Sequence, residues 1–281
     1  MSAAARLLQI TDALTQVGLR FLIMGGHAVR HYGIDRNTFD FDFHVSMEQA
    51  QDLSGRLRRT DFGSQPVFKE VATWRPADFR RFQIGVLPNG KEEWLEFWFR
   101  NHLLAPFVTL YERREESVEE SRSLCYLSLA DLIRSKETER DDDWSDVRLL
   151  EEMLDARHLA AATGQAGPLQ ALSQLRSRRG FERAETMGLF QDVAFIAEAI
   201  RQAVHPVTRA YLLPFAPDIE IRPPALPSEP SVDAVLRRLQ PGSPRHLAVV
   251  EAVRLAYQRA AKAADRADKE QQQARNKPGT T

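Results

Sequence analysis

The spacing of apolar residues predicts short strands and helices in the first half of the chain and longer helices in the second. Apolar side chains three or four positions apart indicate a helix over 3–17. Continuous or alternating apolar runs predict strands over 20–24, 38–45, 80–87, 93–100, 107–111 and 124–127, and a short helix over 27–32 follows the first strand. This order favours an α/β (α+β) fold with a mixed β-sheet flanked by helices.

Two serines have the spacing of helix starts. Ser46 with Gln49 forms a capping-box spacing and predicts a helix to about residue 59. Ser128 stands three residues before Asp131 and predicts another helix, and a further one ends near residue 158. These helices would alternate with the strands of the sheet.

Beyond residues 164–168, which contain Gly and Pro and suggest a boundary, the pattern is almost entirely helical. Helices are predicted over 169–178, 182–204, from 231 and over 244–269, with a proline-rich connection over 214–230. We therefore predict a first domain over 1–158 and an all-helical domain over 159–281, with a polar tail from about 271.

Composition restricts the class of protein. Apolar residues make up 43% of the 281 residues and charged residues 27%, which is typical of a globular protein, and the net charge of -1 argues against a strongly basic surface that coats nucleic acid. Cys125 is the only cysteine, so an internal disulfide and a cysteine-cluster zinc site are excluded. No apolar run reaches the roughly 18 residues of a membrane span, and we expect a cytoplasmic protein with no membrane partner.

The richest chemistry lies in residues 21–45. An apolar run ends at Gly25 and Gly26, a pair that lets backbone approach a phosphate in front of a helix. Asp40 and Asp42 follow on a predicted strand, where alternate residues face the same side. Adjacent carboxylates repel each other, and a hard divalent cation such as Mg²⁺ relieves that repulsion. The combination suggests metal-assisted phosphoryl or nucleotidyl transfer.

The whole pattern resembles the signature of the nucleotidyltransferase superfamily of DNA polymerase beta type, in particular of bacterial minimal nucleotidyltransferase-like proteins that include AbiEii-type toxins. The matching residues are Gly25, Gly26, Ala28, Gly33, Arg36, Thr38, Asp40 and Asp42, and a looser similarity extends over about the first 155 residues. The resemblance implies transfer of a nucleoside monophosphate from an NTP, with Mg²⁺ (or Mn²⁺) held by Asp40 and Asp42 and the phosphates held by Gly25 and Gly26.

A third acid is expected on a neighbouring strand. Glu96 lies inside an aromatic run and is the preferred candidate for the metal site and for the base, and Glu93 is the weaker alternative. Many members of the superfamily have Asp at this position. The competing interpretation of Glu96 is an edge-strand residue that faces water.

Several basic residues are candidates for phosphate binding. Arg36 would pair with Asp40 or Asp42 or reach a phosphate, and the alternative is a surface charge. Lys136, followed by Arg140, Asp143 and Asp146, resembles a second motif of the family, in which Lys136 neutralises the triphosphate and the aspartates hold Lys136 or Arg140; a solvated charged helix is an equal alternative.

A local basic cluster lies further along the chain, in the helical half. It consists of Arg176, Arg178, Arg179 and Arg183, and such a cluster can bind RNA phosphates. A solvated helix end is the more common arrangement, and it is the interpretation we prefer from the sequence.

The acceptor stays open between tRNA, a protein side chain and a small molecule. Within the superfamily, the chain would be a toxin of a toxin–antitoxin pair with a cognate antitoxin, or a resistance enzyme. Outside enzymology, it would be a nucleotide-binding or scaffold protein on a degenerate nucleotidyltransferase fold.

Overall fold

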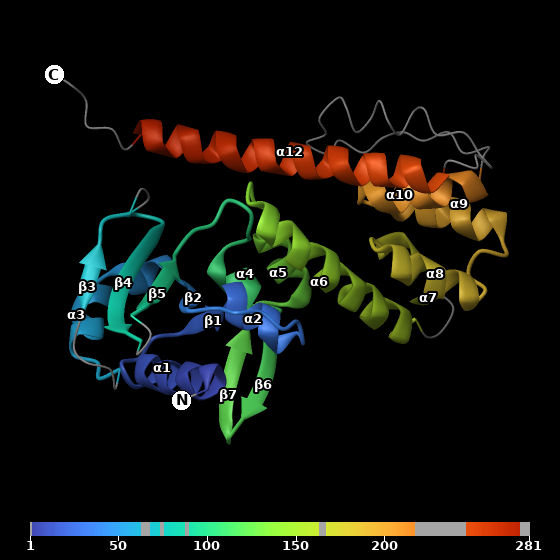
Figure 1. Cartoon of the computed structure of the whole chain (residues 1–281). Helices are drawn as coiled ribbons and strands as arrows, with labels where there is room; N and C mark the ends of the chain where they lie inside the picture. The colour runs from blue at the N-terminus through green and yellow to red at the C-terminus, as the bar shows by residue number, and fades with distance from the viewer. Residues whose placement is uncertain are drawn as a thin grey trace. The chain divides into compact units, whose positions relative to one another are not determined.

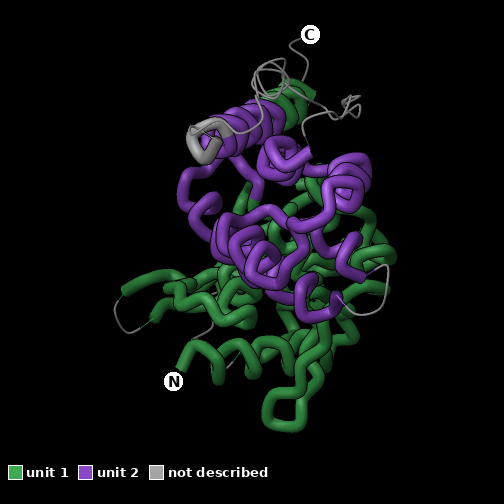
Figure 2. Tube along the Cα trace, turned by 90° about the vertical axis from the view of Figure 1, so that its right-hand side faces the viewer, with its two compact units in different colours: residues 1–136, 267–281 green, residues 137–266 purple. Residues whose placement is uncertain are grey.

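The computed structural model describes residues 2–62, 68–73, 76–87, 90–162, 167–216 and 246–275. The chain divides into two compact units, which Figure 2 shows in different colours. Unit 1 is Met1–Lys136 with Ala267–Thr281, and unit 2 is Glu137–Arg266. The functional boundary expected after residue 158 stays a prediction, because compactness does not show which segments act as a domain.

Unit 1 contains a seven-stranded mixed sheet in its described residues (Figure 1). The strands, in spatial order, are β3 (Lys69–Val71), β4 (Phe79–Val86), β5 (Glu92–Trp98), β2 (Asp40–Val45), β1 (Phe21–Ile23), β7 (Arg122–Tyr126) and β6 (Glu115–Glu119). Strand β2 is antiparallel to β1 and parallel to β5, and β1 is parallel to β7. The predicted fold class, a mixed sheet with helices followed by a helical region, is confirmed.

Helices accompany this sheet in unit 1: α1 (Ala3–Gln16), α2 (Gly25–His31), α3 (Leu53–Arg58), α4 (Phe107–Glu112) and α5 (Leu129–Ser135). The central strands β2 and β5 alternate in burial. Phe41, Phe43, Leu95 and Phe97 are buried, and each such side chain contributes roughly 1.5–3 kcal/mol of hydrophobic stabilisation. The residues between them face the other side of the sheet and are less buried, which leaves one face of the central strands for polar chemistry.

Two local predictions in unit 1 were wrong. Residues 107–111 form helix α4 and not a strand, because Pro106 precedes the first turn and Phe107 and Leu110, three positions apart, are buried together. The helix expected after Ser46 is a 3-10 turn, Met47–Ala50, and then α3, separated by Asp52 at φ 55°. Ser46 makes no capping hydrogen bond with its side chain.

Other local features of unit 1 agree with the pattern or add to it. The predicted cap at Ser128 is confirmed, since its hydroxyl accepts a hydrogen bond from the backbone N–H of Asp131 at 3.2 Å. Strands β3 and β6 were not predicted, because they are short and mostly polar and carry little hydrophobic signal.

Unit 2 is helical throughout its described residues. Its elements are α6 (Asp141–Ala160), α7 (Gly167–Gln174), α8 (Arg178–Thr186), α9 (Val193–Gln202), α10 (Pro206–Leu212), the 3-10 turn Leu213–Phe215 and α12 (His246–Arg275), whose end is counted with unit 1. A core that includes Leu172, Phe181, Ile200 and Tyr211 holds these helices together.

The single helix predicted over 182–204 is interrupted. Gly188 adopts φ +78° after α8, and the Asp192 carboxylate then caps α9 by accepting from the backbone N–H of Ala194 at 2.8 Å. The predicted connection over 214–230 and the helix near 231 lie almost wholly outside the described residues. Among the helices that the structure describes, none combines the length and hydrophobicity that crossing a bilayer requires.

Candidate active site

The register of β2 against β5 brings three carboxylates to one face of the sheet. Asp42 pairs with Glu96, and Asp40 pairs with Trp94. Asp40 and Asp42 point to the same side because they are two residues apart on one strand. The side chain of Glu96 is 16% exposed, whereas that of its basic neighbour Arg81 is 35% exposed. The structure therefore brings Asp40, Asp42 and Glu96 together, as the sequence pattern predicted.

Glu93, the weaker candidate for the third acid, lies on the other face of β5. It is buried and accepts a hydrogen bond from Nε of Arg6 at 2.8 Å through Oε1. This ion pair joins α1 to the sheet. Glu93 is thus a structural residue that is separated from Asp40 and Asp42 by the strand itself.

The electrostatics of the site come from crowding of like charges. Burial and the neighbouring charge of Asp42 raise the pKa of Glu96 to about 9, while Arg81 acts in the opposite direction. The pair Glu96 and Asp42, which a side-chain hydrogen bond joins, therefore retains a proton more readily than isolated carboxylates do. An added cation would relieve this repulsion and release the proton.

Arg81 is the one functional candidate here that sequence reasoning missed. Its Nε lies 3.0 Å from Oε1 of Glu96 and its Nη2 lies 3.8 Å from Oδ1 of Asp40. The guanidinium also lies 4.0 Å from the centre of the Trp94 ring, a cation–π contact that holds it over the sheet. Arg81 stands opposite Glu96 in the β4–β5 hairpin. Regular counting across that hairpin does not find Arg81, because the register shifts between Gln83 and Gly85.

Gly25 and Gly26 allow the start of α2 to press against the acids. Gly25 has φ +61°, and a Cβ there would lie 1.9 Å from Oδ2 of Asp42. A Cβ on Gly26 would lie 2.4 Å from the hydroxyl of Thr38. The backbone N–H of Met24 donates to the carbonyl of Asp42 at 2.9 Å. Only glycine fits at these positions, and the expected contact of the pair with phosphates stays a prediction.

The basic candidates lie on neighbouring segments of unit 1. Arg36 is half-buried in the loop between α2 and β2. Lys136 is buried at the C-terminal end of α5, and α5 packs against α2, the helix that carries the glycine pair. Their roles toward a nucleotide remain predictions.

The second family motif extends into unit 2. Nε of Arg140 lies 3.8 Å from Oδ2 of Asp143, and the hydroxyl of Thr138 donates to the same oxygen at 2.7 Å. The expectation that an aspartate of this motif holds Arg140 therefore agrees with the geometry. Asp146 is buried one turn further along α6.

His27 belongs to the packing of unit 1. Its ring stacks on Phe41 with centroids 4.6 Å apart. Burial lowers the pKa of His27 to about 4, so the ring is neutral at physiological pH. We assign it no chemical role.

The donor chemistry of the site fits a hard divalent cation, but no metal site is preformed. Three carboxylates on one face are the oxygen ligands that Mg²⁺ and Mn²⁺ take. Within the described ranges, however, no group of three or more Asp, Glu, His or Cys side chains has the arrangement of a formed metal site. Arg81 supplies positive charge beside Glu96 and Asp40. Metal binding would therefore require the carboxylates to turn away from Arg81.

Comparison with known proteins finds similarity only at the level of solved structures. No protein-family model and no curated protein matches the chain. An antigenic nucleotidyltransferase-like protein from Paracoccidioides brasiliensis is similar with a TM-score of 0.38 and 15% identity, over 71% of this chain and 94% of that one. The nucleotidyltransferase toxin MenT4 from Mycobacterium tuberculosis H37Rv is similar with a TM-score of 0.34 and 16% identity, over 97% of this chain and 90% of that one. These scores are low, and function has to be argued from the site.

Proposed function

We propose that this protein is a metal-dependent nucleotidyltransferase that moves a nucleoside monophosphate from an NTP to an acceptor and releases pyrophosphate. The observation that carries the proposal is the convergence of Asp40, Asp42 and Glu96 on one face of two parallel strands, with the Gly25 backbone against Asp42. Carboxylates that crowd together on one face are suited to a cation and to a phosphorylated substrate.

Each residue has a distinct role in this proposal. Asp40, Asp42 and Glu96 would hold Mg²⁺ or Mn²⁺, which would supply charge neutralisation at the transferred phosphorus and activation of the acceptor hydroxyl. Glu96 would accept or direct the proton of that hydroxyl, since it lies beside Asp42. Gly25, Gly26, Arg36 and Lys136 would hold the phosphates through backbone N–H groups and cationic side chains.

The acceptor defines the biological role. We include tRNA, a protein side chain and a small molecule as acceptor classes, and a toxin with a cognate antitoxin as one form of the proposal. Expression of the wild-type chain in a bacterial host separates this form from the others. A toxin would slow growth, and the Asp40→Ala, Asp42→Ala double variant would not.

The test of the proposed activity is nucleotide transfer by the purified full chain. Each labelled NTP would be incubated with Mg²⁺ or Mn²⁺ and with total cellular RNA and protein. The double variant Asp40→Ala, Asp42→Ala is the catalytic control. Asp141→Ala is the matched surface control, because the Asp141 side chain is 88% exposed and pairs only with Lys262 among the residues described.

We expect label in RNA, in protein or in a small product, lost in the double variant and kept in Asp141→Ala. The acceptor class follows from the labelled fraction. No transfer with any NTP, combined with no metal-dependent nucleotide binding, would reject the proposal in favour of a degenerate fold used as a scaffold.

A further inference from the structure

A cavity of about 360 Å³ is lined only by residues of unit 2, whereas Asp40, Asp42 and Glu96 belong to unit 1. Its volume is within the roughly 300–1,000 Å³ of pockets that bind small ligands. Besides two valines of α10 and α12, its lining consists of Arg176, Arg178, Phe181, Tyr211, Glu251 and Arg254. The lining therefore contains three guanidinium groups and one carboxylate.

Two of these arginines keep hydrogen-bond donors for a ligand. Arg178 is 70% exposed and uses Nε to bind Glu182 at 2.7 Å, which leaves its two terminal nitrogens. Among the described residues, the guanidinium of Arg176 has one ion-pair partner, Glu137, at 4.0 Å, which is beyond hydrogen-bond distance. Both side chains therefore carry unused donors beside one cavity.

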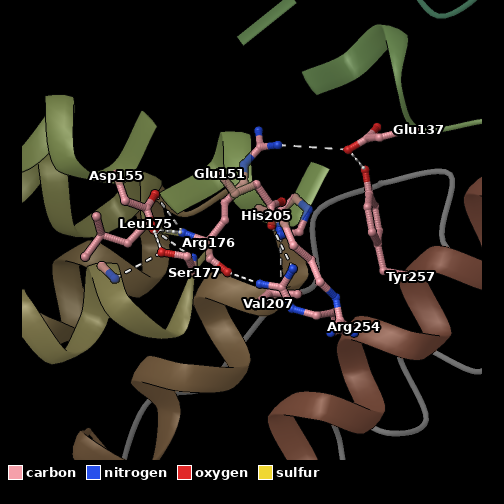
Figure 3. Close-up of polar contacts among 12 residues, drawn as sticks. Glu137, Glu151, Asp155, Leu175, Arg176, Ser177, His205, Val207, Arg254 and Tyr257 are labelled. Carbon is pink, nitrogen blue, oxygen red and sulfur yellow. Dashed lines mark hydrogen bonds and ion pairs between the residues drawn. The ribbon is translucent and has the colours of Figure 1, made fainter. Parts of the chain in front are cut away.

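The third arginine, Arg254, forms a fixed wall of the cavity. Its Nη1 binds the buried Glu151 at 2.7 Å, and its Nη2 donates to the backbone carbonyl of Arg176. Figure 3 shows Arg254 reaching from α12 toward this carbonyl, with Arg176 directed toward Glu137. The backbone of Arg176 is held in turn by Asp155, whose carboxylate accepts its N–H at 3.1 Å. The backbone of Arg176 is thus held by buried contacts on both sides.

Apart from the three arginines and Glu251, the lining is aromatic and aliphatic. The rings of Phe181 and Tyr211 are stacked with centroids 3.9 Å apart and an interplanar angle of 4°. Val207 and Val250 complete this apolar lining. A cavity with guanidinium donors and an aromatic and aliphatic wall suits a ligand that has an anionic end and a flat or apolar body.

We propose that this arginine cavity binds one phosphate-bearing nucleotide unit, either a free nucleotide or a residue of a single-stranded RNA. Arginine recognises phosphate through paired N–H donors, and the base or sugar would lie against the apolar wall. The inference goes beyond the proposed transferase activity, and it rests on the geometry of unit 2 alone. It also revises the interpretation of the basic cluster, because Arg176 and Arg178 line the cavity whereas the neighbouring Arg179 binds Glu152 at 2.8 Å.

The test measures binding by the full chain in EDTA, so that no divalent metal is available to the Asp40–Asp42 site. The probes are a fluorescently labelled short single-stranded RNA, and AMP as competitor and as direct ligand. The variants are Arg178→Gln and the matched control Arg179→Gln. Both side chains are exposed, at 70% and 77%, and both have one glutamate partner, so neither change should impair folding.

We expect Arg178→Gln to weaken binding about tenfold and Arg179→Gln to change it less than about twofold, since only Arg178 faces the cavity. RNA binding that AMP displaces indicates a nucleotide site, and RNA binding that AMP does not displace indicates recognition of a strand. Equal loss in both variants, or no binding of either probe, would overturn the proposal. Binding kept in Asp40→Ala, Asp42→Ala would show that it is independent of the transferase site, whose own activity is measured separately.

Discussion

The two units place a carboxylate in opposite electrostatic surroundings. In unit 2, Asp155 is fully buried and accepts hydrogen bonds from the backbone N–H of Ser177 at 2.7 Å, from its hydroxyl at 2.6 Å and from the backbone N–H of Arg176. In unit 1, Glu96 faces another carboxylate, Asp42, and shares one arginine with Asp40. In the first arrangement hydrogen-bond donors surround the carboxylate, whereas in the second one carboxylate faces another.

The pKa values express this difference. Burial raises the pKa of Asp155 to about 6 against the lowering effect of its hydrogen bonds, whereas burial and the charge of Asp42 act together to raise the pKa of Glu96 to about 9. Burial alone therefore does not mark a functional acid. A carboxylate that is crowded by like charges is the better candidate, because an external cation or substrate can complete it.

The largest expected effect is on activity at the site formed by Asp40, Asp42 and Glu96. Asp42→Asn should lower nucleotide transfer by at least about 10³-fold, because it removes an anionic ligand of the proposed metal while it keeps the shape of the side chain. Single-turnover transfer of labelled NTP measures this loss. If Asp42→Asn and the control Asp141→Asn both retained transfer, the acids of unit 1 would not form a catalytic site.

The next largest expected effect is on stability, at Asp155 in unit 2. Asp155→Ala should lower the free energy of unfolding by about 3 kcal/mol, because the buried donors of Arg176 and Ser177 lose their acceptor. Urea denaturation followed by circular dichroism measures the change. Asp141→Ala should cost less than about 0.5 kcal/mol, since its ion pair is exposed. A small loss in Asp155→Ala would mean that the network does not stabilise unit 2.

Glu96→Gln should act in the opposite direction in the metal-free protein. A carboxyl whose folded pKa is raised above its unfolded value destabilises the fold increasingly as pH rises from about 4.5 to about 9. Gln resembles the protonated form and removes this effect, so the variant should be more stable than the wild type by roughly 2 kcal/mol at pH 8 and equally stable at pH 4. Urea denaturation in EDTA at both pH values provides the measurement. A variant that is less stable at pH 8 would show that Glu96 is satisfied within the fold.

The smallest effect concerns Arg81, the cation beside Glu96 and Asp40. Arg81→Gln should destabilise the metal-free protein by about 1 kcal/mol at neutral pH, because Glu96 and Asp40 lose the guanidinium beside them. Added Mn²⁺ should then raise the melting temperature of the variant more than that of the wild type, since metal and Arg81 neutralise the same carboxylates. Equal thermal shifts in the two proteins would show that they do not compete. Arg80→Gln, on the same strand, is the matched control.

The hairpin that carries Arg81 illustrates why sequence reasoning reached only part of the site. Pairing Val86 with Glu92 and counting back in register would place Phe82 opposite Glu96. An irregularity between Gln83 and Gly85 shifts the register by one residue and places Arg81 there instead. Because a shift of one residue reverses the face of every side chain, this bulge decides whether an arginine or a phenylalanine meets the acid.

The sequence by itself determined the local geometry of the acids and the class of fold. The two-residue spacing of Asp40 and Asp42, the adjacent glycines and the alternating apolar residues follow from the backbone periods of strands and turns, which depend on neighbours in the chain. Tertiary structure alone decided which distant residues meet. The exact register that sets Glu96 opposite Asp42, the position of Arg81 and the arginine cavity of unit 2 depend on strand pairing and helix packing between segments far apart in sequence. Local periodicity carries no information about such pairing or packing.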